Sequence, residues 1–149
     1  MQTEIKNSWF YNEPAEIIWN YLTQPELIAK WLMANNFEPV VGHEFYFKTN
    51  PVPTLNLDGM FYCKVVEVEP AKKLSYSWQG GPGNGVITLD TFVTWRLETE
   101  DNGTRLHLLH SGFTEENAAI YAGMLNGWQQ NIEKMIRSIN TNSDANTRA

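Results

Sequence analysis

The sequence predicts an α+β fold in which one curved antiparallel β-sheet packs against a long C-terminal helix. Apolar and polar residues alternate over much of residues 36–112, as they do in strands with one buried face. Two short segments with helical spacing precede this region, and a long apolar stripe at helical spacing follows it. Strands grouped together and then covered by a helix favour an α+β fold over alternating parallel α/β units.

The first 35 residues are expected to form one strand and two short helices. Residues 3–11 are rich in β-branched and aromatic side chains, which predicts a strand. Pro14 suits the first turn of a helix, and apolar residues recur at helical spacing in the eight residues that follow it. Thr23 is the expected N-cap of a second helix, which has Pro25 in its first turn.

Most of the predicted sheet lies between residues 36 and 112, and about six to seven strands are expected in all. After the first strand, the expected segments are residues 43–49, 60–68, 74–78, 86–98 and 104–111. The glycine-rich run at 80–85 leads into a strand, so it indicates a flexible connection and not a phosphate-binding loop, which must open a helix. The Asp-Asn-Gly sequence at 101–103 predicts a tight hairpin turn.

The last predicted element is a long amphipathic helix over residues 115–139. Thr114 is a suitable N-cap, and two glutamates follow it in the first turn. One face of this helix carries the apolar residues Tyr121, Met124, Leu125, Trp128, Ile132, Met135, Ile136 and Ile139. Residues 1–139 are expected to form a single domain, because their number fits one. Residues 140–149 are polar and are predicted to be a disordered tail.

Composition and charge exclude several classes of partner. The chain has 149 residues and a net charge of −6, and its longest run of basic residues is the pair Lys72 and Lys73, which argues against a nucleic-acid partner. A single cysteine, Cys63, allows no intrachain disulfide and fits a reducing compartment. Neither an apolar membrane span nor a signal peptide is visible, so we expect a cytoplasmic protein without membrane insertion.

No catalytic residue, metal site or cofactor is predicted. His107 and His110 lie three residues apart on one strand, so they should point to opposite faces of the sheet. Cys63 lacks the second cysteine of a metal-binding pair, and the serines lack the sequence context of a hydrolase nucleophile. Cys63 and His110 could both face inward as a reactive pair, although a lone cysteine is more often a small buried hydrophobe.

Aromatic residues make up 13% of the chain, and strand parity places many of them on faces that should look at the long helix. Such rings form either a bulky core or the wall of a cavity, and the sequence leaves both interpretations open. For His110, the alternatives are a structural histidine bonded to a neighbour and a polar anchor that, with Tyr76, orients a ligand. The candidate ligand-binding residues are Trp31, Phe47, Tyr76, Trp78, Trp95, His110, Met124 and Trp128.

Several phrases of the sequence occur in the order found in one known family. They are residues 14–32, 37–48, 65–78, 104–113 and 125–135. Together they resemble the START/Bet v 1-like (SRPBCC) superfamily, and more narrowly the C-terminal domain of the activator of Hsp90 ATPase. The resemblance implies a helix-grip fold, in which a curved sheet grips the C-terminal helix with a cavity between them. It also implies hydrophobic ligands such as lipids or flavonoid-like molecules, and in some members cyclase or hydrolase activity.

Three functions are therefore expected as alternatives. The first is binding of a hydrophobic small molecule in a cavity between the sheet and the C-terminal helix. The second is a cyclase or hydrolase that uses the same cavity, with His110 as acid or base. The third, a stress-related module that interacts with an Hsp90-type chaperone, rests on the resemblance alone. A chain of 149 residues has no room for the N-terminal domain by which the eukaryotic co-chaperone engages Hsp90.

Overall fold

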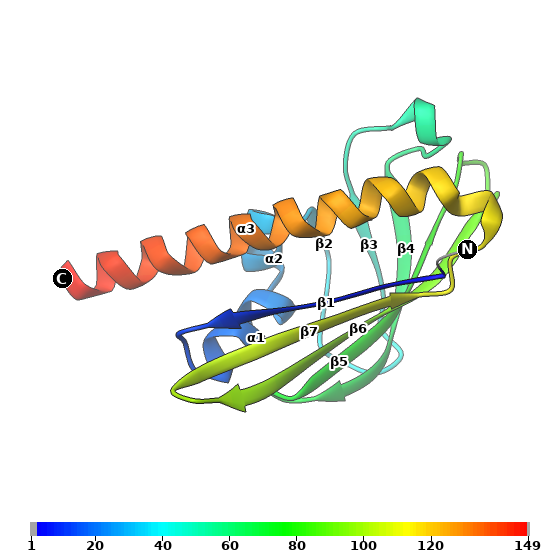
Figure 1. The fold of residues 1–149 in the computed structure, drawn as a ribbon. Coiled ribbons are helices and arrows are strands. Elements are labelled where there is room, and N and C mark those ends of the chain that lie inside the picture. Colours follow the sequence, from blue (N-terminus) through cyan, green and yellow to red (C-terminus); the bar gives the residue numbers. More distant parts are fainter. Residues whose placement is uncertain (1–2, 149) are drawn as a thin grey trace.

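A curved antiparallel sheet holds one long helix against its concave side (Figure 1). The computed structural model describes residues 3–148, with side chains described through residue 141. Within that range seven strands pair in the order β1-β7-β6-β5-β4-β3-β2. Their bounds are β1 (Glu4–Tyr11), β2 (Ala34–Asn35), β3 (Glu44–Lys48), β4 (Met60–Glu69), β5 (Lys73–Gly80), β6 (Leu89–Glu100) and β7 (Gly103–Ser111).

The two short helices lie where the sequence places them, and the third starts later and ends later than its predicted range. They are α1 (Ala15–Thr23), α2 (Pro25–Trp31) and α3 (Ala118–Arg148), with the short 3-10 segments η1 (Pro53–Leu55) and η2 (Glu115–Asn117). The predicted α+β class and the helix-grip architecture are confirmed. Strand β2 could not be predicted from the sequence, because two residues are too few to show alternation.

Thr23 is not the N-cap of α2, contrary to the prediction. It is the last residue of α1, and its hydroxyl donates a 2.8 Å hydrogen bond to the carbonyl of Trp19 one turn earlier. Gln24 takes the cap position without a side-chain cap bond, and Pro25 opens the helix as expected. The hydroxyl of Thr23 therefore serves the end of one helix and not the start of the next.

Helix α3 begins and ends differently from its predicted range. Thr114 precedes η2, and its backbone N–H donates to Oδ1 of Asn117 at 3.0 Å, while the Asn117 amide donates to the carbonyl of Thr88 at 2.9 Å. Residues 118–148 then form one continuous helix, whose last turns extend past the sheet (Figure 1). The helix therefore runs through residues 140–148 of the segment that the sequence predicts as a polar tail. Ala149 lies outside the described residues.

Side-chain alternation along the strands builds the core. In β3, Phe45 and Phe47 are buried while the three residues around them are exposed. Strand β4 carries an irregularity in its pairing with β5 between Val65 and Glu67, which explains why its facing is ambiguous in the sequence. From α3, Trp128, Ile132, Met135 and Ile139 join the same buried cluster as the inward residues of the sheet.

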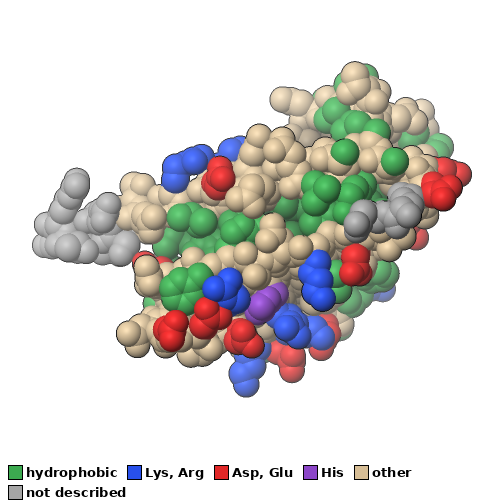
Figure 2. All heavy atoms as spheres, viewed as in Figure 1, with side chains coloured by type: hydrophobic (Ala, Val, Ile, Leu, Met, Phe, Trp, Pro, Cys, Tyr) green, Lys and Arg blue, Asp and Glu red, His purple; other side chains and the backbone are tan. Residues whose placement is uncertain are grey.

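Strand β1 contacts α3 along the front of the molecule. Trp9 Nε1 donates to Oε1 of Gln129 at 3.2 Å, and the Tyr121 hydroxyl donates to the carbonyl of Glu4 at 3.0 Å. Figure 2 shows hydrophobic side chains along this seam and a band of charged side chains across the sheet below it. Strand β1 thus contacts α3 on one side, and helix α2 also packs against α3.

Candidate ligand-binding pocket

A cavity of about 360 Å³ opens beside α3, between the helix, the end of α2 and the segment that joins β3 to β4. This volume falls within the usual range of small-molecule sites, about 300–1,000 Å³. Its walls are mostly apolar. The lining residues are Leu32, Met33, Thr49, Val52, Leu55, Leu57, Phe61, Trp78, Ile120, Gly123, Met124, Gly127, Trp128, Asn131 and Lys134.

The helical wall of the pocket contains two glycines. The lining residues of α3 follow one another at intervals of one or three positions from 120 to 134, so they share one helix face. A Cβ atom added at Gly127 would meet nothing within 4 Å, and one added at Gly123 would meet only Leu55 Cδ1 at 3.6 Å. Neither glycine is therefore required for close backbone packing. Glycine in a helix interior lowers helix stability by about 1 kcal/mol relative to alanine. These two glycines therefore lower the stability of α3 and leave space beside it.

We expect Gly127→Ala to raise the free energy of unfolding by about 0.5–1 kcal/mol, because a methyl group there has room and favours the helix. Urea denaturation measures the change. Gly103→Ala is the contrasting variant, since its added Cβ would collide with the carbonyl oxygen of Tyr11, and it should destabilise the protein. A loss of stability in Gly127→Ala would mean that the space beside the helix is not open.

Three of the eight predicted lining residues lie on the pocket wall. They are Trp78, Met124 and Trp128. The other five pack in the interior behind that wall and are not among its described residues: Trp31, Phe47, Tyr76, Trp95 and His110. The rings mostly touch one another, with centroids 4.9 Å apart for Phe47 and Trp78 and 5.4 Å apart for Trp95 and Trp128. The aromatic cluster is thus largely core, and its edge forms one wall of the pocket.

The polar atoms of the interior rings bond to the protein. Trp31 Nε1 donates to the carbonyl of Tyr21 at 2.8 Å, and Trp95 Nε1 donates to the Tyr76 hydroxyl at 3.0 Å. Tyr76, which the sequence predicts to orient a polar group of a ligand, accepts this bond in the interior and is not among the described residues of the pocket wall. Burial also raises the pKa of Tyr76 well above its ordinary value, so the hydroxyl stays neutral.

His110 holds Trp128 in place through a chain of hydrogen bonds. Trp128 Nε1 donates to Nδ1 of His110 at 3.1 Å, so the imidazole proton must sit on Nε2. Nε2 then donates to the Thr91 hydroxyl at 2.8 Å, and that hydroxyl donates to the carbonyl of Trp78 at 2.8 Å. Both ring nitrogens of His110 and the hydroxyl proton of Thr91 are thus engaged in hydrogen bonds.

The surroundings of His110 keep its ring neutral. Its side chain is 0% exposed, and burial lowers its pKa to about 3. Both ring nitrogens are engaged, and the ring is not among the described residues of the pocket wall. His110 therefore fits the structural interpretation, and it lacks the free nitrogen that an acid or base role requires.

The buried indole N–H of Trp78 has no hydrogen-bond acceptor among the described residues. Trp78 is 2% exposed, and its Nε1 forms no hydrogen bond with any residue that the structure describes. A buried N–H without an acceptor costs about 1–3 kcal/mol. Its neighbours are rings, with Phe47 stacked on one side and Trp128 edge-on at 5.6 Å.

Sequence reasoning missed most of the pocket wall. Val52, Leu55 and Leu57 come from a proline-containing segment that the sequence indicates only as a loop. Gly127 and Lys134 were not predicted as lining residues, because only the large apolar residues of the helix define the predicted stripe. The usable signal was a pair of glycines four positions apart within that stripe, next to Met124 and Trp128 in the chain.

Other reactive side chains lie away from the pocket. Burial raises the pKa of the Cys63 thiol well above its ordinary value, and His110 bonds to Thr91 and Trp128, so no Cys63–His110 pair forms. Among residues 3–141, no group of three or more His, Cys, Asp or Glu side chains could hold a metal ion. No helix within the described range is both long enough and apolar enough to span a bilayer.

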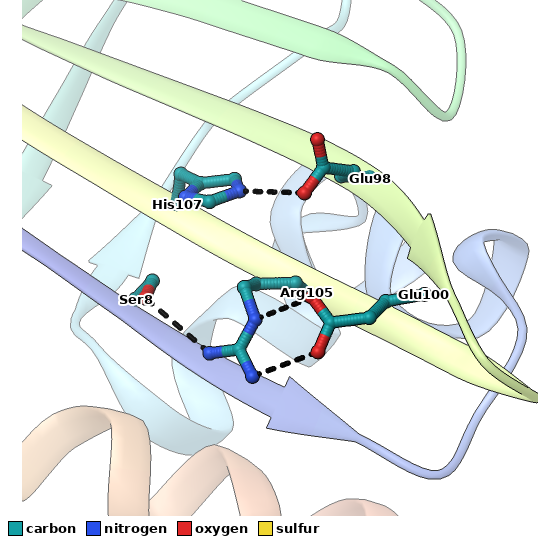
Figure 3. Close-up of polar contacts among 5 residues, drawn as sticks. All are labelled: Ser8, Glu98, Glu100, Arg105 and His107. Atoms are coloured by element: carbon teal, nitrogen blue, oxygen red, sulfur yellow. Dashed lines mark hydrogen bonds and ion pairs between the residues drawn. The ribbon is translucent and has the colours of Figure 1, made fainter.

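The outer face of the sheet carries a polar network across β1, β7 and β6 (Figure 3). Arg105 donates to both carboxylate oxygens of Glu100 at 2.7 and 2.9 Å and reaches the Ser8 hydroxyl at 3.4 Å. His107 lies 3.5 Å from a carboxylate oxygen of Glu98. His107 and His110 therefore point to opposite faces, as predicted. This network lies on the far side of the sheet from the pocket and lines none of it.

Comparison with known proteins supports the family suggested by the sequence. Residues 12–139 match the family model described as Activator of Hsp90 ATPase homolog 1-like protein. The structure is similar to that of protein MLL2253 from Mesorhizobium loti, with 34% identity and a TM-score of 0.82 over 93% of this chain and 97% of that one. No curated protein matches the chain closely enough to count as a relative.

Two further solved structures share the fold. Protein BH1534 from Bacillus halodurans is 27% identical, with a TM-score of 0.70 over 93% of this chain and 99% of that chain. The Aha1 dimer from Colwellia psychrerythraea is 21% identical, with a TM-score of 0.75 over 93% and 96%. The family match covers most of the chain, and the element order and sheet topology agree with it. The chain therefore belongs to the Activator of Hsp90 ATPase homolog 1-like protein family.

Proposed function

We propose that the protein binds a hydrophobic small molecule in the pocket beside α3. The observation that carries this proposal is the pair of glycines on the pocket face of the helix. Gly127 faces open space, and Gly123 has one distant side-chain neighbour, so backbone packing does not account for either. Residues that lower helix stability and leave a cavity are what a binding site needs and a filled core does not.

The rest of the wall suits an apolar ligand. Leucine, methionine and isoleucine side chains from the 52–57 segment and from α3 surround the space, and Phe61, Trp78 and Trp128 add ring surface. Removing such surface from water supplies the main driving force of binding, about 25 cal/mol per Å² of apolar area. A few polar groups at the wall would fix the orientation of the bound molecule.

The pocket is also largely set before a ligand arrives. Trp128 is held by His110, and His110 is held by Thr91, which bonds to the backbone of Trp78. The indole of Trp128 is thus tied, through His110 and Thr91, to the backbone of Trp78. A preformed wall loses little conformational entropy when a ligand binds, which favours affinity.

The other two expected functions have less support. A cyclase or hydrolase that used the same cavity would need a catalytic group other than His110, whose nitrogens are both bonded. An Hsp90-type role rests on family membership alone.

Filling the space at Gly127 tests the proposal. We expect Gly127→Leu to fold and to weaken binding of a hydrophobic ligand by at least about tenfold, equivalent to about 1.4 kcal/mol, because the new side chain occupies the pocket. Thermal-shift screening of the wild type identifies a ligand from a hydrophobic panel, and isothermal titration calorimetry compares the variants.

Asn126→Leu is the matched control, because it adds the same side chain at an exposed neighbouring position outside the pocket. It should bind as the wild type does. The proposal fails if no compound of the panel binds the wild type, or if Gly127→Leu binds as tightly as the control.

A further inference from the structure

The polarity of the pocket changes along α3. At the N-terminal end of its helical wall lie Ile120, Gly123 and Met124, and Leu55 of η1 approaches Gly123 there. At the C-terminal end lie Asn131 and Lys134, near α2, which packs on α3. Figure 1 shows η1 over the early turns of α3 and α2 beside later ones. Fourteen residues separate the two ends, roughly 21 Å at about 1.5 Å per residue.

Lys134 gives the polar end a positive charge. It is the one charged side chain among the described residues of the wall, and it forms no ion pair within the described part of the chain. The chain as a whole carries a net charge of −6, so a cation at the pocket runs against its overall electrostatics. An anionic group is the partner that such an ammonium favours.

The polar end of the wall offers hydrogen-bond donors, and the described residues of the wall include no carboxylate. The donors are the Lys134 ammonium and the amide of Asn131. A ligand group that accepts hydrogen bonds and carries negative charge complements this end. The opposite end of the pocket wall is apolar and includes Leu55, Ile120 and Met124.

We infer that the pocket takes an elongated amphiphile with an anionic, carboxylate-type end at Lys134 and Asn131 and an apolar body directed toward Leu55 and Ile120. This inference rests on the proposed function and adds the chemical class and the direction of the ligand. The oxygen atoms of the carboxylate accept from the lysine ammonium and the asparagine amide. The hydrocarbon chain then follows the helix along the space left by Gly127 and Gly123.

The test compares dodecanoate with dodecanol, which share a chain length and differ in the charged end. Titrations at low ionic strength, below the micelle concentration, should show dodecanoate binding the wild type about threefold to fivefold more tightly, as expected for an exposed ion pair. Lys134→Gln should remove this advantage, so that dodecanoate and dodecanol bind the variant with similar affinities. Lys64→Gln, which changes the net charge equally on the exposed outer face of β4, should keep it.

Nuclear Overhauser contacts supply the direction. The terminal methyl of dodecanoate should contact the methyl groups of Leu55 and Ile120. Equal affinities for the two probes, an advantage that survives in Lys134→Gln, or a terminal methyl beside Lys134 would overturn the inference. If dodecanol still binds and Gly127→Leu still blocks it, the proposed function stands while this inference falls. If neither probe binds and the wider hydrophobic panel also gives no ligand, both fall.

Discussion

Replacing His110 with alanine is expected to lower the free energy of unfolding by about 3–5 kcal/mol. The imidazole is fully buried between Trp78, Phe113 and Trp128, with ring centroids 4.7–5.8 Å away, so its removal leaves a cavity. The indole N–H of Trp128 also loses its acceptor. Chemical denaturation of the wild type and the variant measures the difference.

Thr91→Val separates the hydrogen-bond contribution from the cavity. Valine keeps the shape of the fully buried threonine but takes away the acceptor of His110 Nε2 and the donor to the Trp78 carbonyl. We expect a loss of about 1–3 kcal/mol from the unpaired groups. The double variant should lose less than the sum, because both changes break the same bond. A loss below about 1 kcal/mol in His110→Ala would show that these hydrogen bonds do not hold the Trp128 indole in place.

The fold could be predicted from the sequence because each element carries its own periodic signal. The exposed and buried alternation of β3 and the apolar stripe of α3 indicate a sheet covered by a helix, and both are present. Features that depend on which of two possible hydrogen bonds a side chain forms could not be predicted from the sequence. Thr23 has the chemistry of an N-cap, but its hydroxyl bonds to Trp19 instead.

The site could be predicted only in part, for a geometric reason. Strand parity states which face a ring lies on, but not whether the facing side chains meet or leave a space. Trp78 and Trp95 share the inward side of neighbouring strands, yet Trp78 is on the pocket wall and Trp95 is packed between Trp31 and Trp128. The position of the cavity depends on where side chains are missing, and Gly127 gives no hydrophobic signal.

Burial of His110 should make the stability of the protein depend on pH in a predictable direction. The folded protein keeps the ring neutral, with its pKa lowered to about 3, while the unfolded chain binds a proton near pH 6.5. Protonation therefore favours the unfolded state, and the stability contributed by the neutral ring is present above pH 6.5 and lost as the pH falls toward 3. The full loss is on the order of 5 kcal/mol, of which about 2 kcal/mol falls between about pH 7.5 and about pH 5.

Denaturant unfolding of the wild type and His110→Gln across this range isolates the effect. Carboxylates that titrate at low pH contribute to both proteins, so the difference between the two curves reports His110 alone. The neutral glutamine should make the variant less sensitive to pH by about 2 kcal/mol over the same interval. Nitrogen-detected NMR gives an independent measure, since the folded wild type should still show the neutral tautomer with its proton on Nε2 at about pH 5. A protonated ring at that pH, or parallel curves for the two proteins, would mean that His110 is solvated in the folded state and that Trp128 is held by packing alone.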